Sequence, residues 1–221
     1  MHDMGNQVAV IRSGLGLFLR DPNATPESLK YVKSAYDDNI LLGNMLNDAL
    51  DVGSFESRKM RAELEKTDVV DLMQNMVASF EAAALEGEVQ LTMEVQPDLD
   101  PAASVDRMLI RRVVGNLLTN ALKYAPENTT ITVCLESGAD PDWLTLSVHD
   151  QGSGMSSEEQ KTIFNKYEQA QRYVDHRGRS GRGLGLTFSK MAVEAHEGKI
   201  TVDSKLGEGT VFKVEIPRGL A

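Results

Sequence analysis

Two glycine-rich segments lie at the two ends of a long polar stretch of the chain. The first is DQGSGM, residues 150–155, and the second is GRGLGL, residues 181–186. Glycine lets the backbone approach a phosphate closely and leaves its amide groups free to donate to it. The second segment leads directly into a predicted helix, whose first amide groups and dipole favour an anion. Each segment alone also fits an ordinary tight turn, so the pair suggests a phosphate site without defining it.

A third segment, NLLTNALKY at residues 116–124, adds groups that suit the rest of a nucleotide. Asn116 and Asn120 are four residues apart in a predicted helix, so their amides lie on one face. Amide oxygens can hold Mg²⁺, which keeps most of its waters and phosphate oxygens, and Lys123 can offset phosphate charge. The alternative is a plain polar helix face. Two asparagines inside one helix favour a functional role, because asparagine is a poor helix former.

The order and spacing of five motifs resemble the ATP-binding domain of two-component sensor histidine kinases. These motifs are NLLTNALKY, DQGSGM, IFNKYEQ, GRGLGL and GEGTVF. The resemblance implies the Bergerat ATP-binding fold, with ATP and Mg²⁺ as cofactors. The nucleotide-binding residues that it implies are Asn116, Asn120, Lys123, Tyr124, Asp150, Gly152, Gly154, Phe164, Tyr167, Gly181, Gly183, Leu184, Gly185 and Thr210.

The resemblance also gives several of these residues separate roles. Asn120 and Asn116 become metal ligands, and Asp150 becomes the acceptor for the adenine amino group. Thr210 helps to close the adenine pocket, whereas Phe212 is expected in the core.

The first residues, HDMGN at positions 2–6, resemble the phosphoacceptor box of the same family. The resemblance makes His2 the phosphoacceptor and links Asn6 to a phosphatase activity on the response regulator. A neutral imidazole is a good nucleophile near neutral pH, and Asp3 can take up or orient the proton on its other nitrogen. His149, His176 and His196 are weaker candidates. His196 is expected at a helix end, where a cation is favourable.

Residues 1–65 are predicted to form an antiparallel helical hairpin that presents His2. Apolar residues recur at steps of four and three in Met4, Val8, Ile11, Leu15 and Phe18. This spacing predicts a helix with a coiled-coil-like seam. A turn with two prolines follows, and a second helix is expected at about 26–63. Because one hairpin cannot cover its whole apolar seam, we expect a homodimer with a four-helix bundle.

Residues 66–221 are predicted to form the ATP-binding domain. Helices are expected at 69–85, 106–124 and 184–195, and strands at 89–95, 131–137, 143–150, 199–204 and 210–216. Strands and helices do not alternate strictly, which favours an antiparallel-type sheet with helices on one face. The predicted fold class is therefore α+β, a helical hairpin followed by an α/β sandwich.

The composition is that of a soluble globular protein, with 41% hydrophobic and 25% charged residues. A net charge of -10 argues against direct nucleic-acid binding. A signal peptide and an apolar run of ~20 residues are both missing, so we expect no membrane contact within this chain and a cytoplasmic location. The chain could also be the cytosolic part of a larger, membrane-anchored sensor. The single cysteine, Cys134, excludes an intrachain disulfide and is expected as a small buried filler.

The leading hypothesis is ATP-dependent autophosphorylation of His2 followed by transfer to an aspartate of a response-regulator receiver domain. An alternative is an ATP-binding dimer impaired in autophosphorylation, because one residue precedes His2 and a first helical turn frays. The family's proline after the asparagine position is replaced by Gln7, so the usual kink there is not expected. A serine-directed kinase of the anti-sigma type uses the same ATP fold. That class lacks a helical hairpin with a histidine box, so the predicted hairpin disfavours this interpretation.

Overall fold

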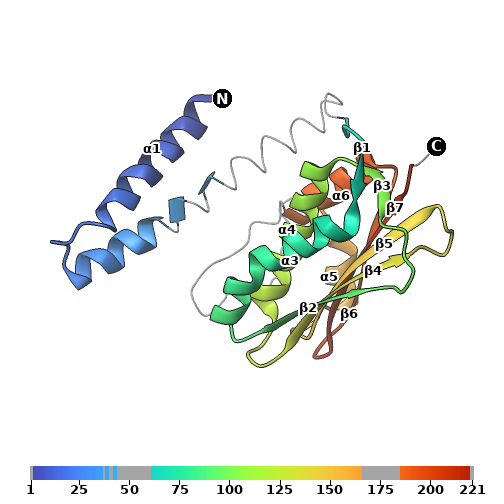
Figure 1. The fold of residues 1–221 in the computed structure, drawn as a ribbon. Coiled ribbons are helices and arrows are strands. Elements are labelled where there is room, and N and C mark those ends of the chain that lie inside the picture. The colour runs from blue at the N-terminus through green and yellow to red at the C-terminus, as the bar shows by residue number, and fades with distance from the viewer. Residues whose placement is uncertain (1, 37, 40–41, 44–60, 166–184, 220–221) are drawn as a thin grey trace. The chain divides into compact units, whose positions relative to one another are not determined.

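The chain forms two compact units, Met1–Ser57 and Arg58–Ala221 (Figure 1). The computed structural model describes residues 2–36, 38–39, 42–43, 61–165 and 185–219, and of residues 2–5 only the backbone. Glu65, near which the domain boundary was expected, is the first residue of a strand in the second unit. Within the described residues, none of the helices is both long and apolar enough to span a membrane.

Two helical segments are found among the described residues of the first unit. Helix α1 spans His2–Phe18, and residues 26–36, 38–39 and 42–43 are also helical. The second helix starts as expected, because the Thr25 side chain accepts a hydrogen bond from the Ser28 backbone at 3.2 Å. It does not reach Glu63, since residues 61–64 are irregular.

The two helices of the first unit run antiparallel. A Cβ placed on Gly16 would lie 3.6 Å from the Tyr36 ring, and one on Gly43 would lie 3.2 Å from Val8. Early residues of α1 therefore face late residues of the second helix, as in the predicted hairpin. The small size of glycine at these two contacts lets the helices approach closely.

The second unit contains both strands and helices, which do not alternate strictly. Its elements in chain order are β1 (Glu65–Asp68), α3 (Val69–Glu86), β2 (Gln90–Val95), β3 (Ala102–Val105), α4 (Arg107–Tyr124), β4 (Thr130–Ser137), β5 (Trp143–Asp150), α5 (Ser157–Thr162), α6 (Gly185–Ala195), β6 (Lys199–Lys205) and β7 (Gly209–Pro217). The predicted helices and strands of this unit are all present, with ends shifted by a few residues.

The main sheet has five strands in the order β2-β4-β5-β7-β6, and β1 and β3 form a separate antiparallel pair. Strands β2 and β4 are parallel, whereas the other neighbours are antiparallel. The prediction of an antiparallel-type sheet is therefore wrong for one edge, and the sheet is mixed. The reason is that α4 lies between β2 and β4 in the chain. This crossover lets the chain enter β4 in the same direction as β2.

Three short elements were not predicted. Strands β1 and β3 have four residues each, too few for a clear hydrophobic period. Helix α5 lies inside the long polar stretch between the two glycine-rich segments, where no helix was predicted. It is started by a capping box in which Ser156 and Glu159 each accept the other's backbone hydrogen bond.

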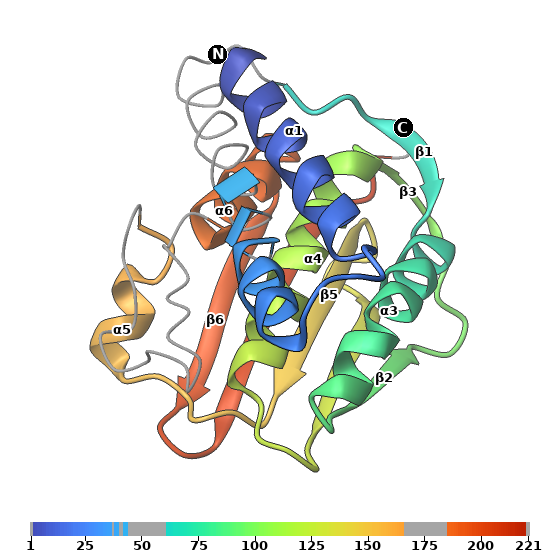
Figure 2. The same ribbon diagram turned by 90° about the vertical axis from the view of Figure 1, so that its left-hand side faces the viewer.

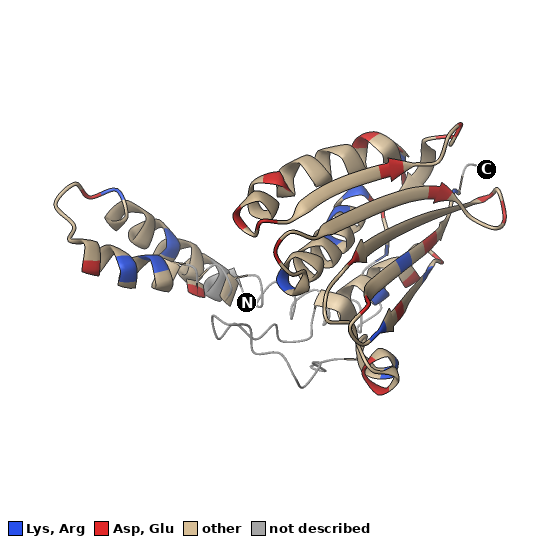
Figure 3. Ribbon diagram, turned by 90° about the horizontal axis from the view of Figure 1, so that it is seen from below, with Lys and Arg blue, Asp and Glu red and all other residues tan. Residues whose placement is uncertain are grey.

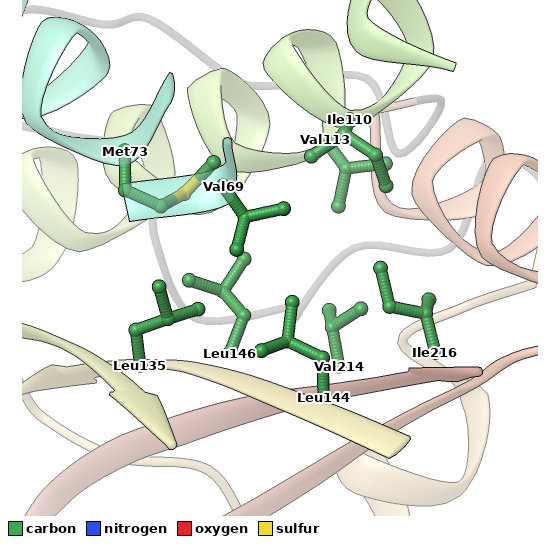
Figure 4. A pocket seen from close by; sticks show the side chains of 9 residues that line it. All are labelled: Val69, Met73, Ile110, Val113, Leu135, Leu144, Leu146, Val214 and Ile216. Carbon is green, nitrogen blue, oxygen red and sulfur yellow. The ribbon is translucent and has the colours of Figure 1, made fainter. Parts of the chain in front are cut away.

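Helices α3, α4 and α6 cover one face of the main sheet (Figures 1 and 2). The strand residues that alternate toward these helices are apolar and buried. Figure 4 shows nine of the side chains in this core, from both the helices and the sheet. The space they enclose is apolar and has a volume of about 10 Å³, so it belongs to a close-packed, dry core.

The other face of the sheet is polar. Acidic and basic residues are interspersed over the described part of the chain (Figure 3), and on β7 Lys213 pairs with Glu215 at 2.8 Å. Cys134 lies on this face, opposite Ser147, and is only half-buried. The expectation of a buried filler was wrong, because the alternation of β4 places Ile131, Val133 and Leu135 in the core instead.

Candidate functional site

Asp150 is a buried carboxylate at the end of β5, only 9% exposed. The alternation of β5 turns it toward the helices together with Val148. Burial raises the pKa of Asp150 above its ordinary value of 3.8, and hydrogen bonds from the backbone of Gly152 and Thr210 partly oppose that rise. The Gly152 bond measures 2.8 Å. These two backbone hydrogen bonds offset only part of the cost of burying the charge, so the ionised carboxylate can gain further from a donor on a ligand.

The turn after Asp150 fits its surroundings because it carries glycines. A Cβ on Gly152 would lie 2.8 Å from both the Asp150 carboxylate and the Tyr124 carbonyl. Gly154 has a φ of +66° and would collide with the Lys205 carbonyl if it had a side chain. The turn is thus clamped between the end of α4 and the turn that joins β6 to β7.

Ser204 links the glycine turn to the start of β7 through hydrogen bonds, and it was not predicted from the sequence as a site residue. Its Oγ accepts the Met155 backbone N–H at 2.8 Å and donates to the Gly209 carbonyl at 2.7 Å. It also lies 3.0 Å from Thr210 Oγ1. Thr210 is the register partner of Asp150, so the two predicted adenine residues are adjacent. The only sequence signal for Ser204 was its position: it is a serine at a place in an alternating strand where the side chain faces the helices.

The asparagine face of α4 meets the start of α6. Asn116 donates its amide to the Gly185 carbonyl at 2.9 Å and to Ser189 Oγ at 3.3 Å. This contact occupies the amide nitrogen, so Oδ1 is the atom of Asn116 that suits a cation. Asn120 and Lys123 are half-buried on the same helix, and the Lys123 ammonium lies 4.9 Å from the Tyr124 ring centroid.

Helix α5 and the following turn are anchored to the sheet. Gln160 donates to the Ser204 and Met155 carbonyls at 2.7 and 3.2 Å. Phe164 stacks edge-on against Phe212 with 6.2 Å between ring centroids. Phe212 is buried, as expected of a core residue. The remaining predicted residues of this stretch lie outside the described residues: Tyr167, His176, Gly181, Gly183 and Leu184.

The predicted phosphoacceptor box lies in α1. His2, Asp3 and Asn6 belong to one continuous helix, and Asn6 is exposed. The side chains of His2 and Asp3 are outside the described part of the chain. Residues four apart on a helix lie on the same face, so the backbone is consistent with the predicted proximity of His2 and Asn6.

His196 is not the solvated cation that its position at a helix end suggested. It is buried, and its Nδ1 lies 2.7 Å from the Ala192 carbonyl while its Nε2 lies 2.9 Å from the Asp106 backbone nitrogen. A carbonyl can only accept and a backbone N–H can only donate, so Nδ1 carries the proton and Nε2 accepts. The ring is therefore neutral and structural.

The residues around Asp150 fit a nucleotide with a metal ion. A buried carboxylate suits an amino group on a base, and the glycine turn beside it lets a ligand approach the backbone. The amide oxygens of Asn116 and Asn120 form a weak protein ligand set, which suits Mg²⁺ bound chiefly by phosphates and water.

Comparison with known proteins places the second unit in a family. Residues 105–220, more than half of the chain, match the histidine kinase-, DNA gyrase B- and HSP90-like ATPases. The circadian input-output histidine kinase CikA of Synechococcus elongatus is 31% identical over 87% of this chain and 25% of its own length. The sensor protein GacS of Pseudomonas syringae pv. syringae is 31% identical over 92% of this chain and 22% of its own. The chain thus spans about a quarter of these relatives.

Solved structures show the same fold. Full-length ShkA, solved in complex with AMPPNP, matches 98% of this chain and 44% of its own with a TM-score of 0.80 and 22% identity. The histidine kinase ThkA, solved in complex with the response regulator protein TrrA, matches 98% of this chain and 59% of its own with a TM-score of 0.64 and 21% identity.

A mixed sheet covered on one face by helices, with a buried aspartate beside a glycine turn, defines a Bergerat-type ATP-binding domain. The chain belongs to the family of histidine kinase-, DNA gyrase B- and HSP90-like ATPases, as the catalytic core of a sensor histidine kinase.

Proposed function

We propose that the chain autophosphorylates on His2 with ATP and passes the phosphoryl group to an aspartate of a response-regulator receiver domain. The observation that carries the proposal is the buried Asp150 carboxylate, held by the Gly152 amide and adjacent to Thr210. The relationship to sensor histidine kinases supports the reaction class. The ThkA–TrrA complex supports a response regulator as the partner.

Asp150 would recognise the base of the nucleotide. A carboxylate accepts hydrogen bonds only, so it selects a base that presents an amino group. Because Asp150 is buried, that bond would form with little competition from water. The adjacent Gly152 would let the base lie against the backbone of the turn.

The phosphates would lie toward the asparagine face of α4. Asn120 and Asn116 would hold Mg²⁺ through their amide oxygens, and the ion would neutralise charge on the phosphates. Lys123, one turn after Asn120, would add a positive charge at the same end of the helix. Gly185 begins α6, whose N-terminal amides favour an anion.

In the transfer step, a ring nitrogen of His2 would form a bond to the γ-phosphorus of ATP. The bond from that phosphorus to the bridging oxygen would break, and ADP would leave with the electron pair. The ring would become cationic, and the proton on its other nitrogen would pass to Asp3. The receiver aspartate would then attack the phosphorus and release His2.

Asn6 would serve the dephosphorylation of the regulator. It is exposed on α1, four residues after His2. Its amide could orient a water molecule toward the acyl phosphate of the receiver aspartate, so that hydrolysis yields inorganic phosphate. This phosphatase role is a separate part of the proposal and needs no nucleotide hydrolysis.

The test is labelling with γ-labelled ATP and Mg²⁺. We expect acid-labile, alkali-stable label on the unmodified protein and its loss in His2→Gln, because the phosphoramidate forms on that ring. His149→Gln is the matched control, since His149 lies on the polar face of the sheet and contacts Ser147. Its label should be unchanged.

Two outcomes would contradict the proposal. Label that persists in His2→Gln would place the phosphoacceptor elsewhere. ATP binding measured by calorimetry, without any phosphohistidine on the unmodified chain, would favour a nucleotide-binding dimer that does not perform the transfer.

A further inference from the structure

Ser204 Oγ is the meeting point of three polar contacts at the nucleotide site. The Met155 backbone nitrogen lies at 2.8 Å, the Gly209 carbonyl oxygen at 2.7 Å and Thr210 Oγ1 at 3.0 Å. All four residues are ordered by the β6–β7 pairing and the glycine turn, and Thr210 is only 7% exposed.

A serine hydroxyl has one proton to donate and two lone pairs to accept with. The Gly209 carbonyl has no proton, so the contact at 2.7 Å requires the proton of Ser204. The Met155 N–H can only donate, and it uses one lone pair of Ser204. The third contact must then be a hydrogen bond that Thr210 donates to the remaining lone pair.

The Thr210 proton is thus committed to Ser204 and points away from the ligand. Thr210 Oγ1 can offer a nucleotide only its lone pairs. Its register partner Asp150 is a carboxylate and also accepts only. Two adjacent acceptor oxygens suit a base with an amino group, and they repel a base that presents a carbonyl oxygen at the same position.

We propose that Ser204 is a positioning residue that sets base specificity by holding the Thr210 hydroxyl as an acceptor. The inference rests on the proposed nucleotide function, and it concerns the choice between 6-amino and 6-oxo purines. Ser204 does not touch the base in this account. It acts through the orientation of a neighbouring proton.

The test compares ATP with inosine triphosphate, whose base carries a 6-oxo group in place of the 6-amino group and a proton on N1. Binding of each is measured by calorimetry on the full chain. In Ser204→Ala the Thr210 hydroxyl is free to turn and donate to a 6-oxo group. The preference for ATP should shrink by about three- to tenfold, the range of one neutral hydrogen bond.

Gln160→Ala is the matched control. Gln160 braces the same segment through the Met155 and Ser204 carbonyls, but it makes no contact with the Thr210 hydroxyl in the described residues. Loosening the segment should weaken both nucleotides alike and keep their ratio. Ser204→Cys keeps the shape but accepts hydrogen bonds weakly, so it should shift the ratio in the same direction and serves if Ser204→Ala does not fold.

A double-mutant cycle separates the proposed route from a general effect. In a Thr210→Val background the hydroxyl is absent, so Ser204→Ala should not change the nucleotide ratio further. An unchanged ratio in both Ser204 variants, with equal losses for the two nucleotides, would overturn the inference. If neither nucleotide binds the unmodified protein, the proposed function itself fails, and the two failures are told apart.

Discussion

At the scale of single residues, Asp150 is expected to favour nucleotide binding while it lowers the stability of the nucleotide-free protein. Its carboxylate is buried, and burial raises the pKa of Asp150 above 3.8. In the nucleotide-free protein, the native state therefore binds this proton more tightly than the unfolded chain does. The contribution of Asp150 to stability is full below pH 3.8 and is lost as pH rises through the raised native pKa. Ionised Asp150 is destabilising until a ligand donates to it.

Asp150→Asn should therefore stabilise the nucleotide-free protein and weaken ATP binding. The amide removes the cost of a buried charge at neutral pH, so the Tm at pH 7 should rise. It also replaces a charged acceptor, so ATP affinity should fall about tenfold or more. Thermal unfolding with and without ATP measures both effects.

The matched control for this change is Asp203→Asn, an exposed carboxylate on the polar face of β6. It should leave both Tm and ATP affinity nearly unchanged. The rise in Tm should also shrink when the measurement is repeated well below pH 3.8, where the carboxyl is protonated in both the native and the unfolded chain. A lower Tm for Asp150→Asn at pH 7 would contradict this account of the residue.

At the scale of elements, α4 and α6 run antiparallel, and hydrogen bonds join both ends of α6 to α4. Asn116 of α4 bonds the first residue of α6, and His196 just after α6 accepts the backbone N–H of Asp106, the cap of α4. Between them, Arg112 lies 3.8 Å above the Phe188 ring. The Asp106 carboxylate also accepts the Glu63 N–H at 3.1 Å. One network thus joins α6, α4 and the segment before β1.

His196→Leu should destabilise the second unit by about 1–3 kcal/mol. Leucine fills the space but leaves the buried N–H of Asp106 without its acceptor. Urea unfolding monitored by circular dichroism gives the change. Lys190→Ala on the exposed side of α6 is the control, because its ion pair with Glu194 is solvated and worth less than about 1 kcal/mol. Equal free energies of unfolding for His196→Leu and the control would show that the hydrogen bond from Asp106 to His196 does not stabilise the second unit.

At the scale of the whole molecule, the described part of the first unit carries exposed apolar side chains. Five of the side chains described there are apolar and more than half exposed: Val10, Ile11, Leu17, Tyr31 and Leu42. Scattered apolar residues are normal on a surface, but exposed apolar side chains on both helices of this unit are compatible with the predicted interface. A second copy of the hairpin would complete a four-helix bundle, as proposed for the homodimer.

Light scattering should give a mass near twice the 24.3 kDa of the chain. The double variant Ile11→Glu with Phe18→Glu should weaken self-association about tenfold or more, because these residues lie on the predicted seam and their charges would be buried in the bundle. Leu85→Glu is the control, since Leu85 is 80% exposed but belongs to α3 of the second unit. A monomeric mass at high protein concentration would contradict the dimer.

The sequence was sufficient to predict the helices and longer strands of the second unit, because their apolar spacing is local. It also predicted that Asp150 and Thr210 act together and that Phe212 is buried, and the structure confirms that they are adjacent and that Phe212 lies in the core. It did not predict β1 and β3, whose four residues carry too little pattern, or the parallel pairing of β2 with β4.

The sequence by itself determined which residues can do chemistry, because the identity and spacing of side chains are local properties. Only the tertiary structure decided how those residues are held. The bond from Asn116 to Gly185 joins residues 69 apart, that from Met155 to Ser204 joins residues 49 apart, and that from Asp106 to His196 spans 90. The direction of each bond depends on what the fold places opposite a hydroxyl or a ring nitrogen, and no local pattern encodes that.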